Sequence, residues 1–264
     1  MRFSRGNLQY NTIGKHRTAD GGTAPGTWRF AQKQYEILGD ENEHVSASNT
    51  GWIDLFGWGT SGWNSGAACY LPWSSSLANN DYYPGGISEG QLTGSFAFAD
   101  WGVYNAINNG GNTPNRWRVL TMEEYEFLCL TRKASTIGRT ANARFVKAIV
   151  NGVKGLILFP DEYTHPKTLP VPVNINIGDA DWEENQYSTD DWNLMEETGA
   201  VFLPAAGVRF GLDLDDQQSG YYWSSTCASN SQAYCLCLGN KEVRPDFAGW
   251  RLYGVSIRLV QDVN

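Results

Sequence analysis

The sequence predicts an α+β fold, and three observations lead to this class. Two segments, residues 121–133 and 188–199, have helix patterns with recognisable caps. Short apolar runs bounded by turn signals surround these segments and are typical of strands. The 264 residues include 29 Gly, 11 Trp and 13 Tyr, which favours large aromatic side chains set among irregular backbone. Because no repeat or low-complexity linker divides the chain, we expect one domain over residues 1–264.

The N-terminal third is predicted to consist of strands and turns. Residues 2–11 form the first strand-like run, and a Gly/Pro-rich loop at residues 19–27 precedes a second. The segment "GWIDLFGWGTSGWNSG" then places Trp52, Trp58 and Trp63 among glycines. We interpret these three rings as core residues, with a sugar-stacking platform as the alternative.

Both helices are predicted from their first and last turns. In the first, Thr121 is the expected cap and Glu124 completes a capping box, while "YEFLC" places apolar side chains on one face. In the second, Ser188 or Thr189 caps a first turn rich in acidic residues, and Gly199 ends the helix.

The remaining apolar runs are predicted to be strands. Residues 143–160 contain two runs separated by Asn151–Gly152, a strong signal for a tight hairpin turn. Further strands are expected in "AVFLPAAG" and in the closing "GVSIRLV".

Composition and charge exclude several functional classes. The net charge is −8, without the basic surface that a nucleic-acid-binding protein needs, so no nucleic-acid partner is expected. The longest apolar runs, such as "GLILF", are too short to span a bilayer, so we expect no membrane insertion by this chain. The start, "MRFSRGNLQYN", lacks the apolar stretch of a signal peptide.

No catalytic or metal-binding motif stands out. His16, His44 and His165 are isolated in the sequence, and "GDADWEEN" lacks the central glycine and distal glutamate of a calcium loop. We interpret this segment and "LDLDDQQSG" as solvated acidic loops. The sequence therefore predicts no catalytic residue, no metal and no cofactor.

Three of the five cysteines lie within eleven residues, in "WSSTCASNSQAYCLCLGN". Along "AYCLCLG" the residues alternate, which predicts a strand with Leu236 packed inward and with Cys235 and Cys237 pointing outward. Side chains two residues apart on one strand are about 6.6 Å apart, too far for a disulfide. No nearby ligand completes a metal site. The outward row resembles a random set of residues on a regular framework.

Several stretches resemble a known family. "RWRVLTMEEYEFL" (116–128) is similar to the motif that starts a helix in the sulfatase-modifying-factor branch of the C-type lectin fold. "FSRGNLQYN", "GWIDLFGWGTSGWNSG", "ADWGVYNAINNGG", "VFLPAAGVR", "GYYWSST" and "YGVSIRLV" resemble lectin-like major paralogous domains of gut Bacteroidales and their phages. The resemblance implies a single C-type lectin-like domain, with two helices, small antiparallel sheets and long irregular Trp/Gly-rich loops.

Some members of this family are variable proteins of diversity-generating retroelements, in which asparagine codons near the C-terminus are rewritten. The resemblance implies a variable region at residues 221–260. The residues that such rewriting can produce, and that we expect to form the ligand-binding surface, are Cys227, Ala228, Ser229, Cys235, Cys237, Gly239, Arg244, Asp246, Phe247, Ala248, Gly249 and Leu252. Gln232, Lys241, Glu242 and Trp250 cannot be produced and are assigned to the framework.

We expect these twelve residues to form one exposed patch. Tyr222, Trp223, Tyr234 and Val255 are expected to lie beneath it as a packed floor. Within the patch, Phe247 and Arg244 are predicted to make the strongest ligand contacts.

The resemblance leaves three functions open. The first is a receptor- or adhesin-type protein that displays a diversified surface, on a cell surface or a phage virion. The second is a fimbrial or cell-surface adhesin domain without diversification. The third is an enzyme of the formylglycine-generating type, which uses a pair of copper-binding cysteines with a wider spacing than C-x-C. The calcium triplets of ligand-binding lectins are absent apart from a faint match in "VRPD" (243–246), so we expect metal-independent binding of a protein or polysaccharide.

Overall fold

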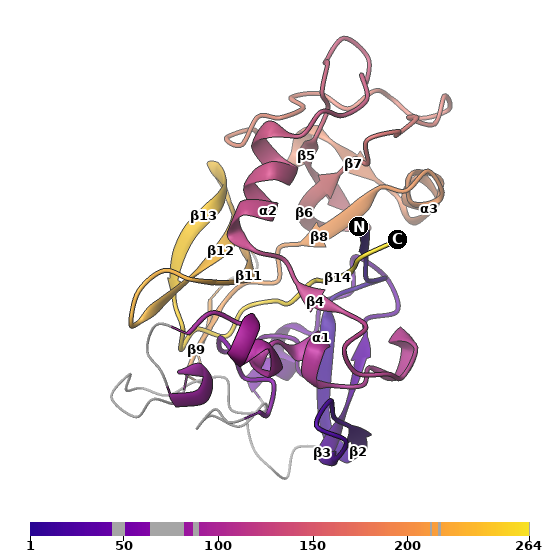
Figure 1. Ribbon diagram of the computed structural model, residues 1–264. Coiled ribbons are helices and arrows are strands. Elements are labelled where there is room, and N and C mark those ends of the chain that lie inside the picture. The colour runs from indigo at the N-terminus through magenta and orange to yellow at the C-terminus, as the bar shows by residue number, and fades with distance from the viewer. Residues whose placement is uncertain (44–50, 64–81, 87–89, 212, 216–217, 264) are drawn as a thin grey trace.

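The computed structural model describes residues 1–43, 51–63, 82–86, 90–211, 213–215 and 218–263. It is a mixed α+β structure with few helices and several small sheets, which agrees with the predicted class (Figure 1). The helices are α1 (Trp101–Tyr104), α2 (Met122–Glu126) and α3 (Thr189–Glu197). The strands are β1 (Arg2–Phe3), β2 (Leu8–Arg17), β3 (Thr23–Phe30), β4 (Arg118–Val119), β5 (Phe145–Val150), β6 (Val153–Leu158), β7 (Gln186–Tyr187), β8 (Val201–Pro204), β9 (Arg209–Phe210), β10 (Asp213–Leu214), β11 (Gly220–Cys227), β12 (Gln232–Gly239), β13 (Glu242–Trp250) and β14 (Leu259–Gln261).

Both predicted helices are present, with the predicted caps. The Thr121 hydroxyl accepts the backbone N–H of Glu124, whose carboxylate accepts the N–H of Thr121 in return. Helix α2 continues as a π-helical turn over Phe127–Thr131. Ser188 and Asp191 form the same reciprocal pair at the start of α3. Helix α1 was not predicted from the sequence, because only four residues form it.

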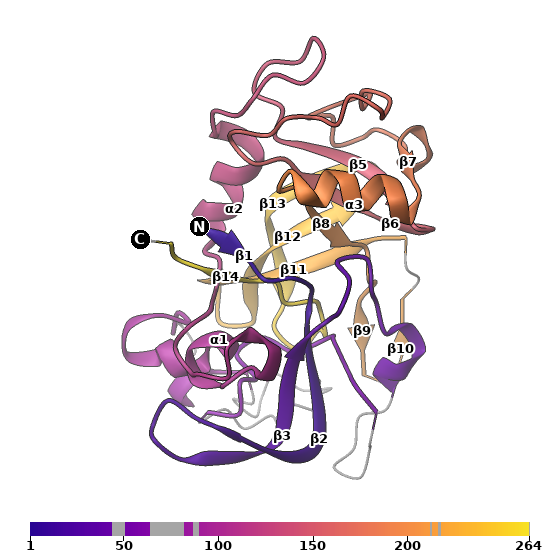
Figure 2. The same ribbon diagram turned by 90° about the vertical axis from the view of Figure 1, so that its right-hand side faces the viewer.

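The four-stranded sheet has the order β7-β5-β6-β8. Strands β5 and β6 form the predicted hairpin, and Asn151 and Gly152 at its turn have φ angles of 49° and 81°. This left-handed pair is what a tight hairpin turn requires. The inner side chains of this sheet pack with Trp192 and Met195 of α3, both of which are buried. Figure 2 shows α3 lying in front of the sheet.

The N-terminal hairpin is longer than predicted. Strand β3 begins at Thr23, so most of the expected loop at residues 19–27 is strand. Gly26 allows this, because its φ angle is 84° and an added Cβ would lie 2.2 Å from the Tyr10 hydroxyl oxygen. Trp58 is fully buried, as expected, whereas Trp52 and Trp63 are only partly buried.

The two ends of the chain meet in one small sheet. Strand β14 pairs with β1 on one side and with β4 on the other, and the termini lie next to each other in Figure 1. Leu8 near one end and Leu259 near the other belong to the same buried cluster, together with Trp28 and Trp101. Residues from both ends therefore contribute to one core.

Among the described residues, no helix is both long and apolar enough to cross a membrane.

The three-stranded sheet β11-β12-β13 carries the C-terminal segment of interest. Strand β12 is central, and β13 lies at one edge. Cys237 pairs with Arg244 and Cys235 with Phe247, so a bulge in β13 sets three residue steps of β13 against two of β12. Pro245 lies within this bulge. Both faces of β12 are covered: Leu236 packs in one buried cluster and Cys235 in another.

Candidate functional site

The cysteine face of this sheet forms the floor of a pocket. Cys235 pairs with Trp223 of β11 and with Phe247 of β13, so these three side chains lie on the same face. The pocket above them has a volume of about 380 Å³. Its lining residues are Val208, Phe210, Asp213, Leu214, Asp215, Tyr221, Trp223, Cys235, Phe247, Gly249, Tyr253 and Val255.

Trp223 holds the floor in place. Its side chain is fully buried, and its indole N–H donates to the carbonyl oxygen of Phe56 at 2.8 Å. Gly249 lies directly against it, since an added Cβ would be 3.3 Å from the Trp223 ring and 3.5 Å from Sγ of Cys235. Glycine at this position therefore leaves the pocket open, and any larger side chain would fill part of it.

The prediction that Cys235 and Cys237 point into solvent is wrong, because each is only 1% exposed. The side chains of β12 alternate between its two faces as predicted, but the cysteine face is covered. The rings of Tyr221 and Phe247, 5.6 Å apart, close over it, and the chain around β9 and β10 forms the opposite wall of the pocket.

Burial also controls the chemistry of both thiols. It raises the pKa of Cys235 well above its ordinary value, and it raises the pKa of Cys237 to about 12, with the charge of Glu242 acting in the same direction. The Cys237 thiol lies 3.7 Å from Oε1 of Glu242. Both side chains are therefore neutral thiols near neutral pH, and they act as small apolar surfaces.

The rim of the pocket combines aromatic and charged side chains. The guanidinium of Arg244 lies over the Phe247 ring, 5.2 Å from its centre. It is also 3.8 Å from a carboxylate oxygen of Glu242 and 3.8 Å from one of Asp246. Across the pocket, the half-exposed Phe210 packs edge-on against Tyr253 at 5.5 Å.

A buried arginine holds the turn between β11 and β12. The side chain of Arg251 is fully buried, and its guanidinium donates to the carbonyl oxygens of Ser229 at 2.7 Å and Gln232 at 3.3 Å. Nη2 also donates to Sγ of Cys227 at 2.7 Å. The guanidinium stacks on the Trp58 ring at 4.5 Å.

A buried lysine holds the turn between β12 and β13 in the same way. Lys147 comes from β5, and its ammonium group donates to the carbonyl oxygens of Gly239 at 2.9 Å and Asn240 at 2.7 Å. It lies over the Trp182 ring at 4.1 Å. Burial lowers the pKa of Lys147, and the nearby acidic side chains of Asp181 and others act against this effect.

The twelve predicted site residues do not form one exposed patch, so that expectation is also wrong. Cys235, Phe247 and Gly249 line the pocket, and Arg244 and Asp246 are exposed beside it. The others lie elsewhere because strand alternation and the turns separate them. Cys237 is buried next to Tyr221, Ala248 lies on the opposite face, Cys227, Ala228 and Ser229 are at one turn, Gly239 is at the other, and Leu252 is buried against Tyr82.

Only part of the expected floor is present, because Trp223 and Val255 line the pocket and Tyr222 and Tyr234 do not. Tyr222, Trp223 and Val255 are buried, whereas Tyr234 is only partly buried. Tyr222 lies under the opposite face of the sheet, in the cluster that contains Leu236, and therefore does not line the pocket.

Sequence reasoning missed one wall of the pocket. Asp213 and Asp215 come from "LDLDDQQSG", which was interpreted as a solvated acidic loop, and Phe210 lies just before it. The apolar residues between the acids, as in "RFGLDL", are the signal that could have indicated a short hairpin, and β9 pairs with β10 there. Nothing in the sequence shows that this hairpin faces β12.

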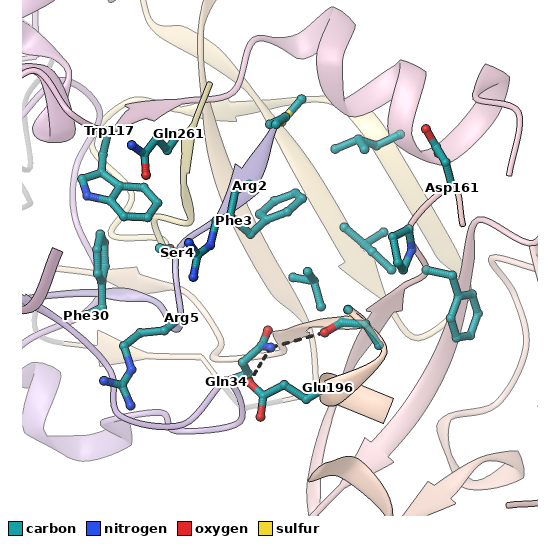
Figure 3. Close-up of a pocket in the computed structure, with 18 of the residues that line it drawn as sticks. Arg2, Phe3, Ser4, Arg5, Phe30, Gln34, Trp117, Asp161, Glu196 and Gln261 are labelled. Carbon is teal, nitrogen blue, oxygen red and sulfur yellow. Dashed lines mark hydrogen bonds between the residues drawn. The ribbon is translucent and has the colours of Figure 1, made fainter. Parts of the chain in front are cut away.

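A second, larger cleft lies beside strand β1 (Figure 3) and has a volume of about 1180 Å³. Some of its charged groups are held by contacts within the chain. Arg132 bridges to Asp161 at 2.9 Å, and Gln34 donates to Glu196 at 2.8 Å. None of the twelve predicted residues lines this cleft.

Other candidate chemistry is explained by structure. The ring of His16 is buried between the Gly26 carbonyl oxygen and the Asn105 side chain, while His44 and Cys69 lie outside the described residues. The part of the chain that the structure describes contains no group of three or more His, Cys, Asp or Glu side chains arranged to hold a metal ion.

Comparison with known proteins gives no relative. No family model, no curated protein and no solved structure matches this chain.

Proposed function

We propose that the protein binds a ligand through the pocket on the β11-β12-β13 sheet, as a receptor- or adhesin-type protein built on a C-type lectin-like scaffold. The observation that carries the proposal is the pocket itself. It joins five aromatic side chains to a rigid sheet floor, and it contains three residues that the sequence had assigned to ligand binding: Cys235, Phe247 and Gly249. Rigid aromatic walls with a few polar groups at the rim are typical of binding sites.

The anchoring of the two turns supports a surface that tolerates changes in sequence. Arg251 and Lys147 hold the hairpins mainly through backbone carbonyl oxygens. Such contacts do not depend on which side chains the hairpin residues carry. Substitutions at exposed positions such as Arg244 and Asp246 can therefore alter ligand choice without moving the backbone.

We further propose that residues 221–260 are a variable region of the diversity-generating type. The positions with room for variation are at the pocket and its rim, namely Arg244, Asp246 and Phe247. Buried positions such as Leu252 accept only substitutions that preserve packing. In the fixed-adhesin alternative, the same pocket binds a single partner. A reverse transcriptase gene and a near-copy of the variable segment close to this gene would distinguish the two.

The enzyme alternative receives less support from the geometry. Copper-binding or nucleophilic cysteines need accessible thiolates. The pKa of Cys235 is raised well above its ordinary value and that of Cys237 to about 12, and both side chains are covered. A ligand-binding role, in contrast, does not require either thiol to be ionised or accessible.

The proposal can be tested on an array of purified bacterial and host surface proteins and polysaccharides. The array is probed with the unmodified protein and with Phe247→Ala, which removes one wall of the pocket. We expect the signal for at least one partner to fall about tenfold or more, as for a central aromatic contact.

Phe127→Ala is the matched control. Phe127 is a half-exposed phenylalanine in the second cleft, far from the predicted site residues in sequence. Binding that survives Phe247→Ala and is lost with Phe127→Ala would assign the function to the second cleft and contradict the proposal.

A further inference from the structure

The pocket on the β11-β12-β13 sheet has an unusual combination of lining groups. Two carboxylates, Asp213 and Asp215, lie among aromatic rings, and none of the described residues that line the pocket is basic. The rings belong to Phe210, Tyr221, Trp223, Phe247 and Tyr253. The faces of aromatic rings carry negative electrostatic potential and attract cations. The aromatic rings and the carboxylates therefore both favour a positively charged ligand.

The charges around the pocket do not cancel this preference. Arg244 is at the rim, but it is already stacked on Phe247 and lies between Glu242 and Asp246. Arg209 is fully buried, and its Nη2 donates to the carbonyl oxygen of Leu55, while its neighbours Val208 and Phe210 line the pocket. The Arg209 guanidinium is therefore held in the core, and Arg209 is not among the described residues that line the pocket.

The position of Arg244 shows that one ring of the pocket already binds a cationic group. Its guanidinium already occupies a position over the Phe247 ring, at 5.2 Å. A cation from a ligand would meet the remaining rings of the pocket, where the Phe210–Tyr253 pair and Tyr221 supply further ring faces. Burial raises the pKa of Tyr221 to about 12, so this side chain is a neutral phenol and not an anion at neutral pH.

The size of the pocket limits the guest. Ligand pockets range from roughly 300 to 1,000 Å³. At about 380 Å³, this one is near the lower limit and has room for one long side chain rather than for an oligosaccharide. An aliphatic stem fits the apolar floor of Trp223, Cys235 and Val255, with the charged end toward the carboxylates.

We propose that the pocket binds an alkylguanidinium or alkylammonium group, as at the end of an arginine or lysine side chain presented by a protein ligand. This inference rests on the proposed function, because it names the chemistry that the same site recognises. Polysaccharide ligands without amino groups are then excluded from this pocket.

Four small probes of similar length test the inference: n-butylguanidinium, n-butylammonium, neutral 1-pentanol and anionic pentanoate. Binding is followed by NMR chemical shifts of the pocket residues, including the Trp223 indole. We expect both cations to bind at least about tenfold more tightly than 1-pentanol, and pentanoate to bind more weakly than 1-pentanol.

The double variant Asp213→Asn/Asp215→Asn identifies the source of the preference. Cation affinity should fall about tenfold, while 1-pentanol affinity stays the same. The control, Asp190→Asn/Glu197→Gln, removes the same charge from exposed positions on and next to the ends of α3, and should leave all four affinities unchanged. Thermal unfolding of each variant confirms that the fold is retained.

The outcomes separate this inference from the proposed function. If 1-pentanol binds in the pocket as tightly as the cations, or if pentanoate binds best, the cation preference is overturned and the binding pocket stands. If the double variant binds cations as the unmodified protein does, the carboxylates have no role and the inference also fails. If no probe shifts the pocket resonances, both proposals are overturned.

Discussion

The ammonium group of Lys147 lies 2.7 Å from the carbonyl oxygen of Asn240, and this contact joins the four-stranded sheet to the β12–β13 turn. The two residues are 93 positions apart in the chain. The contact fixes one end of the proposed binding sheet to a part of the core that takes no part in the pocket.

Replacing Lys147 by Met should destabilise the protein by about 1–3 kcal/mol. The methionine fills the same space but leaves the carbonyl oxygens of Gly239 and Asn240 without their donor. Urea unfolding measures the change. Lys241→Met is the control, because Lys241 is an exposed lysine near the same turn and its loss should have an effect within about 0.5 kcal/mol. Equal effects in the two variants would show that the buried contact contributes nothing.

The four cysteines that the structure describes should react with N-ethylmaleimide in a fixed order. Cys227 is partly exposed, whereas Cys129, Cys235 and Cys237 are buried and their raised pKa values keep them protonated. Because the thiolate is the reactive form, labelling of the folded protein at pH 8 should modify Cys227 first. Peptide mass mapping identifies the labelled residues, and labelling in urea provides the reference in which these four react alike. Early modification of Cys235 would contradict its placement under the pocket.

Removing the cap of α2 should weaken the protein modestly. Thr121→Ala deletes the hydroxyl that accepts the N–H of Glu124, which should cost about 0.5–2 kcal/mol. Thr168→Ala, at an exposed loop position, is the control. Denaturation midpoints that coincide for the two variants would mean that the cap adds no stability.

Stability should decrease as the pH rises from about 5 to about 7. Burial raises the pKa of Asp54 to about 6 and that of Asp100 to about 7. In the folded state both groups keep protons that the unfolded chain has already released, so the free energy of unfolding falls across this interval, by on the order of 4 kcal/mol. Exposed carboxyl groups with lowered pKa, such as Asp191 and Asp262, titrate below it.

Urea unfolding at several pH values measures this slope. Asp100→Asn should flatten it, because the amide does not titrate. A free energy of unfolding that rises between about pH 5 and about pH 7 would show that both buried carboxyl groups are ionised in the folded protein.

Features encoded by neighbouring residues were predictable from the sequence. The capping boxes at Thr121 and Ser188 and the turn at Asn151–Gly152 each depend on side chains and φ angles within a few positions. The pairing of Cys235 and Cys237 on one face of a strand followed in the same way from the two-residue period.

Features that depend on distant segments were not predictable. Alternation places Cys235 opposite Leu236, but it does not show that both faces of β12 are covered. The wall that carries Phe210 and Asp213 lies more than twenty positions before Cys235, and no local pattern directs it there. The buried cations Lys147 and Arg251 were missed because a charged residue is normally expected at the surface.

The bulged edge of β13 hinders strand pairing between neighbouring copies of this protein. An edge strand of nine residues invites strand pairing between copies wherever the chain leaves it uncovered. Pro245 offers no N–H, the bulge breaks the regular spacing of hydrogen-bonding groups, and the exposed charges of Arg244 and Asp246 oppose close stacking. Molecules of this protein can therefore be crowded together without polymerising through this edge, and the proposed binding pocket of each stays uncovered.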